Sequence, residues 1–439
     1  MRILITLFIA IYLTGCGGSG GGGGSGIINS PGGNIADLPD DTALIPANSN
    51  SPYIASLTSC LDPDDQTTSC LLSSMPLIGQ TSSPVTAEAI LEKTLVSHQW
   101  MADRWEALLP LFPDDLLQLM GSLTGVVISG DIRPSFYTTQ TGAMYLDAAF
   151  FWLTNAEKAD IGSAPDFRSG FGNELQFITL TRYVKDNNYA WQSFSLEGTE
   201  ERNLQDLVRP LASLLFHELG HANDFFPIAS FGSLLASKSI LQEGDRLASS
   251  RVSSAMVNFS PLSSDLLVDV AEVLFLGANA SQAILELTPE EVADEFRVDV
   301  ANDDYAYTNQ FEDLAILLEE IMMKYHFDID RDIAYIDRPA TNSSFCVDYP
   351  VRWGQRGRVG DPGVKARTRY MLQVLLNQTD VSKYIDDLET PTMMVNGNNW
   401  CQNLNPSPAT ASSSKTLFSR PENPGGLITF PETDKKRYH

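Results

Sequence analysis

His217-Glu218-Leu219-Gly220-His221 places two histidines four residues apart, with a glutamate directly after the first. Residues four apart lie on the same face of an α-helix, so both imidazoles can reach one metal ion. Two histidines and an adjacent glutamate are the parts of a hydrolytic zinc site, in which the glutamate faces the open coordination position. The motif therefore predicts that His217 and His221 bind Zn²⁺ and that Glu218 is the general base.

The residues around the motif predict that it lies on a helix. Pro210 suits a helix start, and leucines recur at helical spacing up to and through the motif. These leucines are Leu211, Leu214, Leu215 and Leu219. The alternative is an amphipathic helix whose two histidines are ordinary polar positions.

A catalytic zinc site needs a third protein ligand, and no further histidine follows His221 closely. We therefore expect a carboxylate, from either Glu295 or Glu312, and Glu312 is the better placed. Glu312 also has a possible structural role, because Asn309 and Glu312 are spaced as a capping box. We favour the ligand role because the two histidines otherwise lack a carboxylate partner.

Two blocks of sequence carry a resemblance to a known family. They are His217-Glu218-x-Gly220-His221-Ala222-x-Asp224 and Tyr305-x-x-Thr308-Asn309-x-x-Glu312-x-x-Ala315. Together they resemble the anthrax-lethal-factor-like branch of the gluzincin metallopeptidases, a broad group that includes the Pro-Pro endopeptidases. The chain departs from this pattern in a longer segment before Tyr305, and in Ile316 where an acidic residue commonly stands.

The resemblance implies a zincin-like α+β fold with a small upstream sheet, an HExxH helix and a downstream helix that carries the glutamate ligand. It also implies that His217, His221 and Glu312 bind zinc, that Glu218 is the general base, and that Tyr305 donates a hydrogen bond to the developing oxyanion.

Two further residues near the motif have open roles. Tyr307 competes with Tyr305 as the oxyanion donor, and the sequence chemistry does not separate them. Asp224 lies on the metal-facing side if the helix persists, where it could orient a ligand histidine. The alternatives for Asp224 are an exposed position at the helix end and direct zinc ligation. The remaining histidines, His98, His326 and His439, are interpreted as structural or as tail residues.

The N-terminal sequence predicts an exported lipoprotein. Met1-Arg2 precedes an apolar run, Ile3 to Leu13, that is too short to span a bilayer and is typical of a signal peptide over residues 1–15. Leu13-Thr14-Gly15-Cys16 resembles a bacterial lipobox, which implies acylation of Cys16 and a membrane anchor. The residue after Cys16 is Gly17 rather than an aspartate, and this resembles the sequence of lipoproteins that are sent to an outer membrane. We therefore expect the protein at the outer membrane or cell surface of the bacterial cell envelope.

Composition predicts the organisation of the mature chain. Residues 16–52 form a Gly- and Ser-rich tether, residues 53–400 a metallopeptidase-like body, and residues 401–439 a mostly disordered tail. Four cysteines remain after Cys16, and their proximity suggests disulfides between Cys60 and Cys70 and between Cys346 and Cys401.

Hydrophobic patterns in the body predict a mixed α/β protein with a helical insertion at 225–304. Short strands are expected at 125–128, 143–146, 176–183 and 189–194, with a turn at 186–188. Helices are expected at 86–109, 114–120, 266–276, 289–300, 366–377 and 381–388. The strand at 176–183 is a candidate edge strand for binding an extended substrate, and an ordinary internal strand is the alternative. The insertion either walls the cleft or packs away from the substrate.

The formal charge of -26 argues against nucleic-acid binding, which needs a basic surface. We therefore expect a membrane-tethered, monomeric zinc metalloendopeptidase that acts on a peptide or protein substrate. One alternative is a non-catalytic surface lipoprotein that retains the zinc site, and another is an amidase acting on cell-wall peptides.

Overall fold

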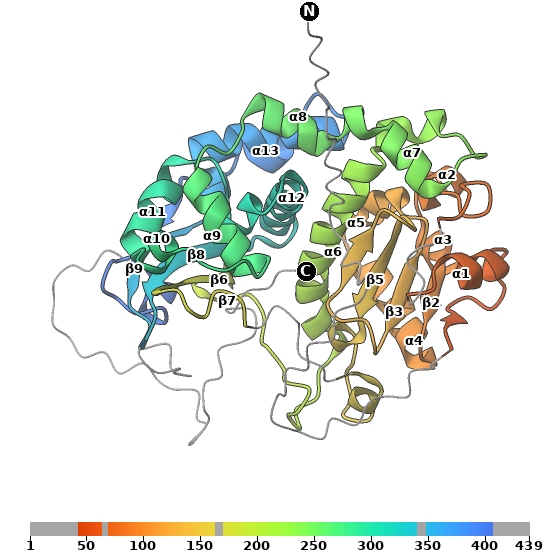
Figure 1. Ribbon diagram of the computed structural model, residues 1–439. Helices are drawn as coiled ribbons and strands as arrows, with labels where there is room; N and C mark the ends of the chain where they lie inside the picture. The colour runs from red at the N-terminus through yellow and green to blue at the C-terminus, as the bar shows by residue number, and fades with distance from the viewer. Residues whose placement is uncertain (1–42, 64–68, 163–169, 340–347, 407–439) are drawn as a thin grey trace, which may run out of the picture.

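The computed structural model describes residues 43–63, 69–162, 170–339 and 348–406 (Figure 1). The protein is mixed α and β, with two separate five-stranded sheets. Helices α6 (Leu204–Phe225) and α12 (Gln310–Phe327) lie between the sheets in Figure 1. These two helices carry the histidine motif and Glu312, so the fold brings both sequence blocks to its centre.

The first sheet precedes α6 in the chain and has the strand order β1-β2-β3-β5-β4. Strands β2, β3 and β5 are parallel and wholly buried, while β1 and β4 are antiparallel strands at the two edges. The strands are β1 Ile45–Pro46, β2 Thr94–Val96, β3 Val126–Ser129, β4 Phe136–Thr138 and β5 Ala143–Asp147. Strand β4 contacts α6, so the edge of this sheet borders the motif helix.

Five helices accompany the first sheet, and one prediction fails among them. They are α1 Ile54–Cys60, α2 Ile78–Thr81, α3 Ala87–Leu91, α4 Gln99–Leu108 and α5 Asp114–Leu119. The single helix predicted for 86–109 is wrong, because strand β2 separates α3 from α4. A short buried strand and a buried helix segment share the same apolar pattern, and pairing with β3 decides this one. The helix predicted at 114–120 is confirmed by α5.

Helix α6 begins earlier than the position of Pro210 predicts. Asn203 is the N-cap and forms a capping box with Asp206, so Pro210 lies inside the helix. From Leu207 to Phe225 every residue except Arg209 is buried. A helix buried on all sides can hold polar side chains only where they have partners, which makes its two histidines conspicuous.

The second sheet is antiparallel and has the strand order β10-β9-β8-β6-β7. Its strands are β6 Phe177–Lys185, β7 Asn188–Tyr189, β8 Asp330–Asp337, β9 Val351–Arg356 and β10 Thr392–Met393. The predicted turn is confirmed, because Asp186 and Asn187 have positive φ and join β6 to β7 as a hairpin. The strand predicted at 189–194 is reduced to β7.

The candidate edge strand at 176–183 corresponds to β6, which the sheet order places between β8 and β7. Strand β7 pairs only with the last two residues of β6. The edge strand that contacts the motif helix is instead β4 of the first sheet. The sequence alone could not assign β4 to an edge, because sheet order depends on pairings between distant segments.

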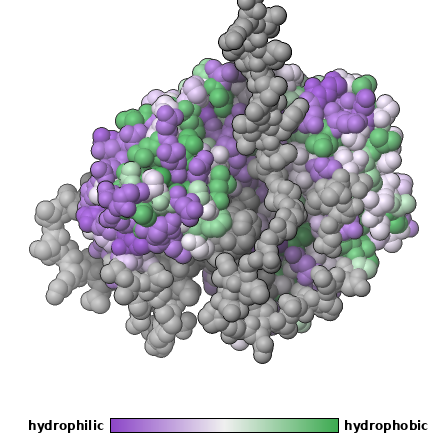
Figure 2. All heavy atoms as spheres, viewed as in Figure 1, coloured by the Kyte–Doolittle hydropathy of each residue, from purple (hydrophilic) through white to green (hydrophobic). Residues whose placement is uncertain are grey.

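The segment between the two sequence blocks is helical, as predicted. It contains α7 Ile240–Arg246, α8 Val252–Phe259, α9 Asp265–Phe275, α10 Gln282–Leu285 and α11 Pro289–Val298. Helix α8 packs on α12 and α13, while α11 packs on β8 and β9. Figure 2 shows polar and apolar residues interspersed over this side of the surface. Val298, the last residue of α11, is among the exposed apolar side chains. Helices α13 Pro362–Leu375 and α14 Ser382–Ile385 confirm the two predicted C-terminal helices.

The folded part extends beyond the predicted body at both ends. Strand β1 lies in the stretch expected to be tether, and a 3₁₀ helix at Gln402–Leu404 lies in the expected tail, where Asn403 is fully buried. The Cys60–Cys70 disulfide is confirmed. Cys401 is also disulfide-bonded, while its predicted partner Cys346 lies outside the described residues.

The predicted signal peptide, the acylated Cys16 and most of the tether and tail also lie outside the described residues. Within the described ranges, no helix is long and apolar enough to cross a membrane.

Helices α6 and α12 cross in direct contact at Gly220. A Cβ atom added at Gly220 would lie 2.7 Å from the Ala315 Cα and 3.1 Å from the Ala315 Cβ. Both residues belong to the sequence blocks, one position before His221 and three positions after Glu312. The absence of a side chain at Gly220 therefore sets how closely the ligand-bearing helices approach.

Helix α12 carries four buried acidic residues, Glu312, Asp313, Glu319 and Glu320, and each has a polar partner. Asp313 pairs with the fully buried Arg367 of α13. Glu320 accepts hydrogen bonds from the Asn302 side chain at 2.8 Å and the Val359 backbone at 3.2 Å. Burial raises the pKa of Glu320 to about 7 against these hydrogen bonds and the charge of Arg331.

Gly220→Ala should destabilise the protein, by about 1–3 kcal/mol in the free energy of unfolding, because the added methyl group overpacks the helix crossing. Inside a helix, replacing glycine by alanine usually stabilises a protein by about 0.5–1 kcal/mol, so the change in unfolding free energy expected here has the opposite sign. Urea unfolding measures it. The control is Gly232→Ala, where an added Cβ meets no atom within 4 Å. A Gly220→Ala variant as stable as the wild type would contradict close crossing.

Glu320→Gln should stabilise the protein increasingly as pH rises from about 5 to about 8. The pKa of Glu320 is higher in the folded state than in the unfolded state, so between these two values the folded protein keeps the Glu320 proton and the unfolded chain does not. The stability of the wild type therefore falls as the pH rises from about 5 toward the folded-state pKa. The variant avoids that loss, which is about 3 kcal/mol at most. Urea unfolding at both pH values tests this, with the exposed Glu272→Gln of α9 as control. A difference from wild type that is equal at both pH values would refute it.

Candidate metal centre

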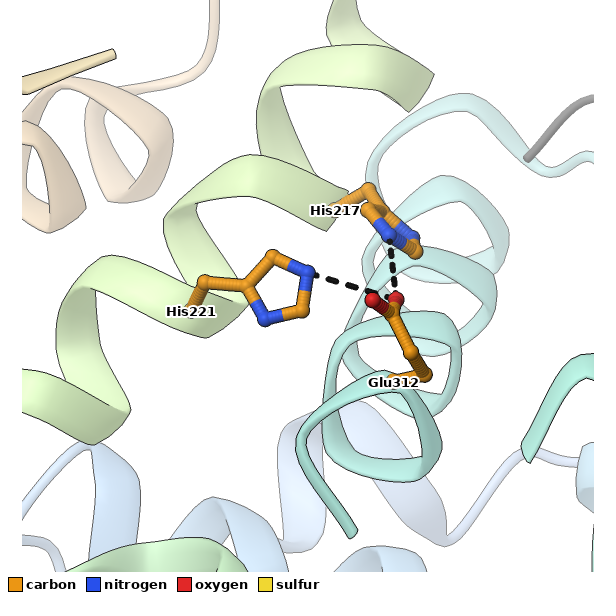
Figure 3. Close-up of side chains that lie close together, drawn as sticks. All are labelled: His217, His221 and Glu312. Carbon is orange, nitrogen blue, oxygen red and sulfur yellow. Dashed lines mark hydrogen bonds and ion pairs between the residues drawn. The ribbon is translucent and has the colours of Figure 1, made fainter. Parts of the chain in front are cut away.

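His217 and His221 project from α6 toward α12, one helical turn apart. Their ring centroids are 5.1 Å apart, and Figure 3 shows both rings turned toward Glu312. Both side chains are buried. The predicted placement of the two histidines on one helix face is therefore confirmed.

Glu312 lies in the first turn of α12 and faces both histidines. Asn309 caps this helix by accepting hydrogen bonds from the backbone N–H groups of Phe311 and Glu312. The Glu312 Oε2 lies 3.2 Å from the His217 Nε2 and 3.3 Å from the His221 Nε2 (Figure 3). The cap thus uses the backbone of Glu312, while its carboxylate is directed to the imidazoles.

The three side chains could hold a metal ion. One ligand atom from each of His217, His221 and Glu312 lies within 4.8 Å of the others. Two atoms bound about 2.1 Å from a tetrahedral ion lie about 3.4 Å apart, close to the two His–Glu distances found here. Glu295, the other candidate, instead accepts a hydrogen bond from the Ser264 hydroxyl.

The electrostatics of the group favour a bound cation. Burial would lower the pKa of His217, but hydrogen bonds to Glu312 and Glu319 and the charges of Glu312 and Glu218 outweigh it and raise this pKa to about 10. Burial would raise the pKa of Glu312, yet the two imidazoles hold it far below its usual range. Three buried carboxylates, those of Glu218, Glu312 and Glu319, thus surround two imidazoles. A divalent ion would offset this negative charge, which is costly to bury unpaired.

Glu319 is a functional residue that the sequence reasoning missed. Its carboxylate lies 3.3 Å from the His217 Nδ1, on the side of the ring opposite Glu312. Ser213 and Tyr183 donate their hydroxyls to the same carboxylate, Tyr183 at 2.8 Å. A carboxylate at Nδ1 fixes the imidazole tautomer and orientation and so presents Nε2 to a metal. The available signal was spacing, because Glu319 follows Glu312 by two helical turns on the same face.

Asp224 is occupied elsewhere. Its two carboxylate oxygens accept hydrogen bonds of 2.7 Å each from the backbone N–H and the hydroxyl of Ser253. Asp224 is fully buried rather than exposed at the helix end, and within the described residues it forms no hydrogen bond to an imidazole ring. Its interaction joins the end of α6 to the start of α8.

The structure separates the two tyrosines. The Tyr305 ring lies alongside His217, with centroids 6.3 Å apart, and packs edge-on against Phe275. The Tyr307 hydroxyl donates a 3.0 Å hydrogen bond to Asp299 and its ring faces Phe296. Both belong to the short 3₁₀ helix Asp304–Tyr307, so their side chains point in different directions. Tyr305 is therefore the tyrosine beside the metal-binding group.

Glu218 is buried next to the histidines and retains a free oxygen. Its Oε1 has no hydrogen-bond partner in the part of the chain that the structure describes. Burial raises the pKa of Glu218, against the lowering effects of the two histidines and of the Tyr137 backbone N–H from edge strand β4. A buried carboxylate with a raised pKa and an unused oxygen is suited to exchanging a proton with a bound molecule.

The remaining histidines have structural contacts, as predicted. His326 stacks on Phe216 and lies 3.2 Å from Asp115. His98 is the N-cap residue of α4, and its Nε2 lies 3.7 Å from Asp160. His439 lies outside the described residues.

Comparisons with known proteins found no matching family model, and neither the curated proteins nor the solved structures gave a match.

Glu319→Gln should weaken zinc binding by about 10- to 100-fold, because His217 loses the carboxylate that orients its ring. Competition with a chromophoric chelator measures the dissociation constant. Glu295→Gln removes a carboxylate of α11 that contacts Ser264, and should bind zinc like the wild type. Equal zinc affinity in the Glu319 variant and the wild type would show that Glu319 does not position His217.

Proposed function

We propose that this protein is a zinc-dependent metallopeptidase of the gluzincin type. The observation that carries the proposal is the convergence of His217, His221 and Glu312 within 4.8 Å, next to the free carboxylate oxygen of Glu218. Two imidazoles and one carboxylate are a ligand set of catalytic zinc sites, which keep the fourth position open. The resemblance of both sequence blocks to gluzincins supports the same conclusion.

The residues around this group have complementary chemical roles. Zinc bound there would polarise the scissile carbonyl and increase the acidity of water, as a Lewis acid does. Glu218 takes the proton from the attacking water and passes it to the leaving amine. Tyr305 donates a hydrogen bond from its hydroxyl to the carbonyl oxygen as negative charge develops there. Glu319 holds the His217 ring in position.

The arrangement of the first sheet supports a peptide substrate. Strand β4 is antiparallel at the sheet edge and contacts α6, the helix that carries Glu218. An extended peptide added along such an edge would pass next to the metal-binding group. We therefore assign to β4 the aligning role first considered for 176–183. A zincin-like architecture with export and lipid anchoring remains part of the proposal.

A structural metal site is the second candidate, and one observation favours it. His217, Glu218 and Glu312 are each at most 3% exposed, whereas a substrate must reach a catalytic metal. A structural zinc site, however, has four protein ligands, whereas among the described residues three candidate ligands lie together here. The peptidase proposal also accounts for the free Glu218 oxygen, which a structural site does not use.

Glu218→Gln should retain zinc but lose peptide cleavage by at least about a hundredfold in kcat, because an amide cannot accept the proton. Mass spectrometry of products from a mixed peptide library, alongside elemental analysis for zinc, measures both properties. The control is Glu106→Gln on the exposed face of α4.

Turnover equal to the wild type would refute the role of Glu218. A wild-type protein that binds zinc yet cuts no peptide would favour the structural site. Cleavage confined to purified cell-wall peptides would identify an amidase.

A further inference from the structure

Arg251 lies where the two metal-binding helices meet the insertion. It is the N-cap of α8, and its guanidinium carbon is 5.4 Å from the ring centroid of Phe225 and 5.3 Å from that of Phe311. Phe225 is the last residue of α6, and Phe311 precedes the metal-binding candidate Glu312. The guanidinium thus lies within cation–π distance of two aromatic rings, one from each helix that carries the candidate metal ligands.

The Arg251 side chain has no hydrogen-bond or ion-pair partner among the described residues. Its Nε is buried and unsatisfied. The nearby acid Asp224 already accepts two hydrogen bonds from Ser253. The buried Arg182, Arg331 and Arg367 behave differently, since each pairs with an aspartate. An unpaired arginine is unexpected in a chain with 55 acidic and 29 basic residues.

Tyr137 supplies a second unpartnered donor in the same place. Its hydroxyl is buried and has no hydrogen-bond partner in the described part of the chain. Its ring packs against Phe225, which also contacts Arg251, with centroids 6.3 Å apart. Burial raises the pKa of Tyr137, while the charge of Arg251 lowers it, so the two groups share one electrostatic environment. Tyr137 also belongs to strand β4, which contacts α6, the helix of the proposed general base Glu218.

We propose that Arg251 and Tyr137 form a carboxylate-binding subsite, which makes peptides that present a carboxylate at this position the preferred substrates. A guanidinium binds a carboxylate through two parallel hydrogen bonds, and a buried hydroxyl can add a third. The carboxylate belongs either to an Asp or Glu side chain near the scissile bond or to a free C-terminus. The inference rests on the proposed peptidase function, because it identifies the substrates of the same site.

The test compares peptides that differ by a single atom group. Zinc-loaded Glu218→Gln protein is titrated calorimetrically with N-acetylated peptides that carry either Glu or Gln at one scanned position. Each peptide is made with a free and with an amidated C-terminus. We expect at least one carboxylate peptide to bind about tenfold or more tightly than its amide partner, which identifies the source of the carboxylate.

Variants assign this preference to the two residues. Arg251→Gln should reduce the ratio of affinities to near one, Arg251→Lys should restore part of it, and Tyr137→Phe should reduce it less. Arg297→Gln removes the same charge from an exposed ion pair with Asp294 and should keep the full ratio. Circular dichroism of each variant confirms folding.

The outcomes separate this inference from the proposed function. Equal affinity for every carboxylate and amide pair, including no measurable binding of either, overturns the subsite, even if the wild type cleaves peptides. A carboxylate preference that Arg251→Gln leaves unchanged also overturns it. A preference that depends on Arg251 in a protein that cleaves nothing supports the subsite and rejects the peptidase.

Discussion

The close crossing of α6 and α12 is the constraint on which the rest of the structure depends. Gly220 lacks the side chain that would meet Ala315, so the two helices pack in direct contact. His221 follows Gly220, and Glu312 lies one turn before Ala315, so this contact sets the distance between the imidazoles and the carboxylate. The two sheets then lie on either side of a fixed pair of helices (Figure 1).

Burial gives this arrangement its chemical character. Helix α12 places four acidic residues in the interior, and the protein partners each of them differently. Arg367 pairs with Asp313, while Asn302 and Val359 donate hydrogen bonds to Glu320. Glu312 and Glu319 contact the candidate metal-ligand histidines. Glu312 and Glu319 thus converge on His217, one at each nitrogen of its ring. This excess of negative charge, together with that of Glu218, is what a divalent cation would balance.

The sequence could predict features that depend on local spacing. The four-residue interval of the histidines fixed their shared helix face, and Asn309 marked the helix start that presents Glu312. Features set by distant contacts were not predictable. Residues 94–96 form a strand because they pair with β3, which is distant in the sequence. Asp224 bonds to Ser253 because α8 packs beside the end of α6. The roles of Glu319 and Arg251 depend on what lies opposite them, which no spacing along one helix reveals.

The most direct test of the central claim is anomalous diffraction at the zinc edge from crystals of the metal-loaded protein. The account predicts one zinc ion per chain, about 2.0–2.2 Å from the Nε2 atoms of His217 and His221 and from a Glu312 oxygen. Glu319 should remain on the His217 Nδ1. A zinc ion bound elsewhere would contradict the account. So would a structure in which His217, His221 and Glu312 bind no zinc and remain hydrogen-bonded directly to one another.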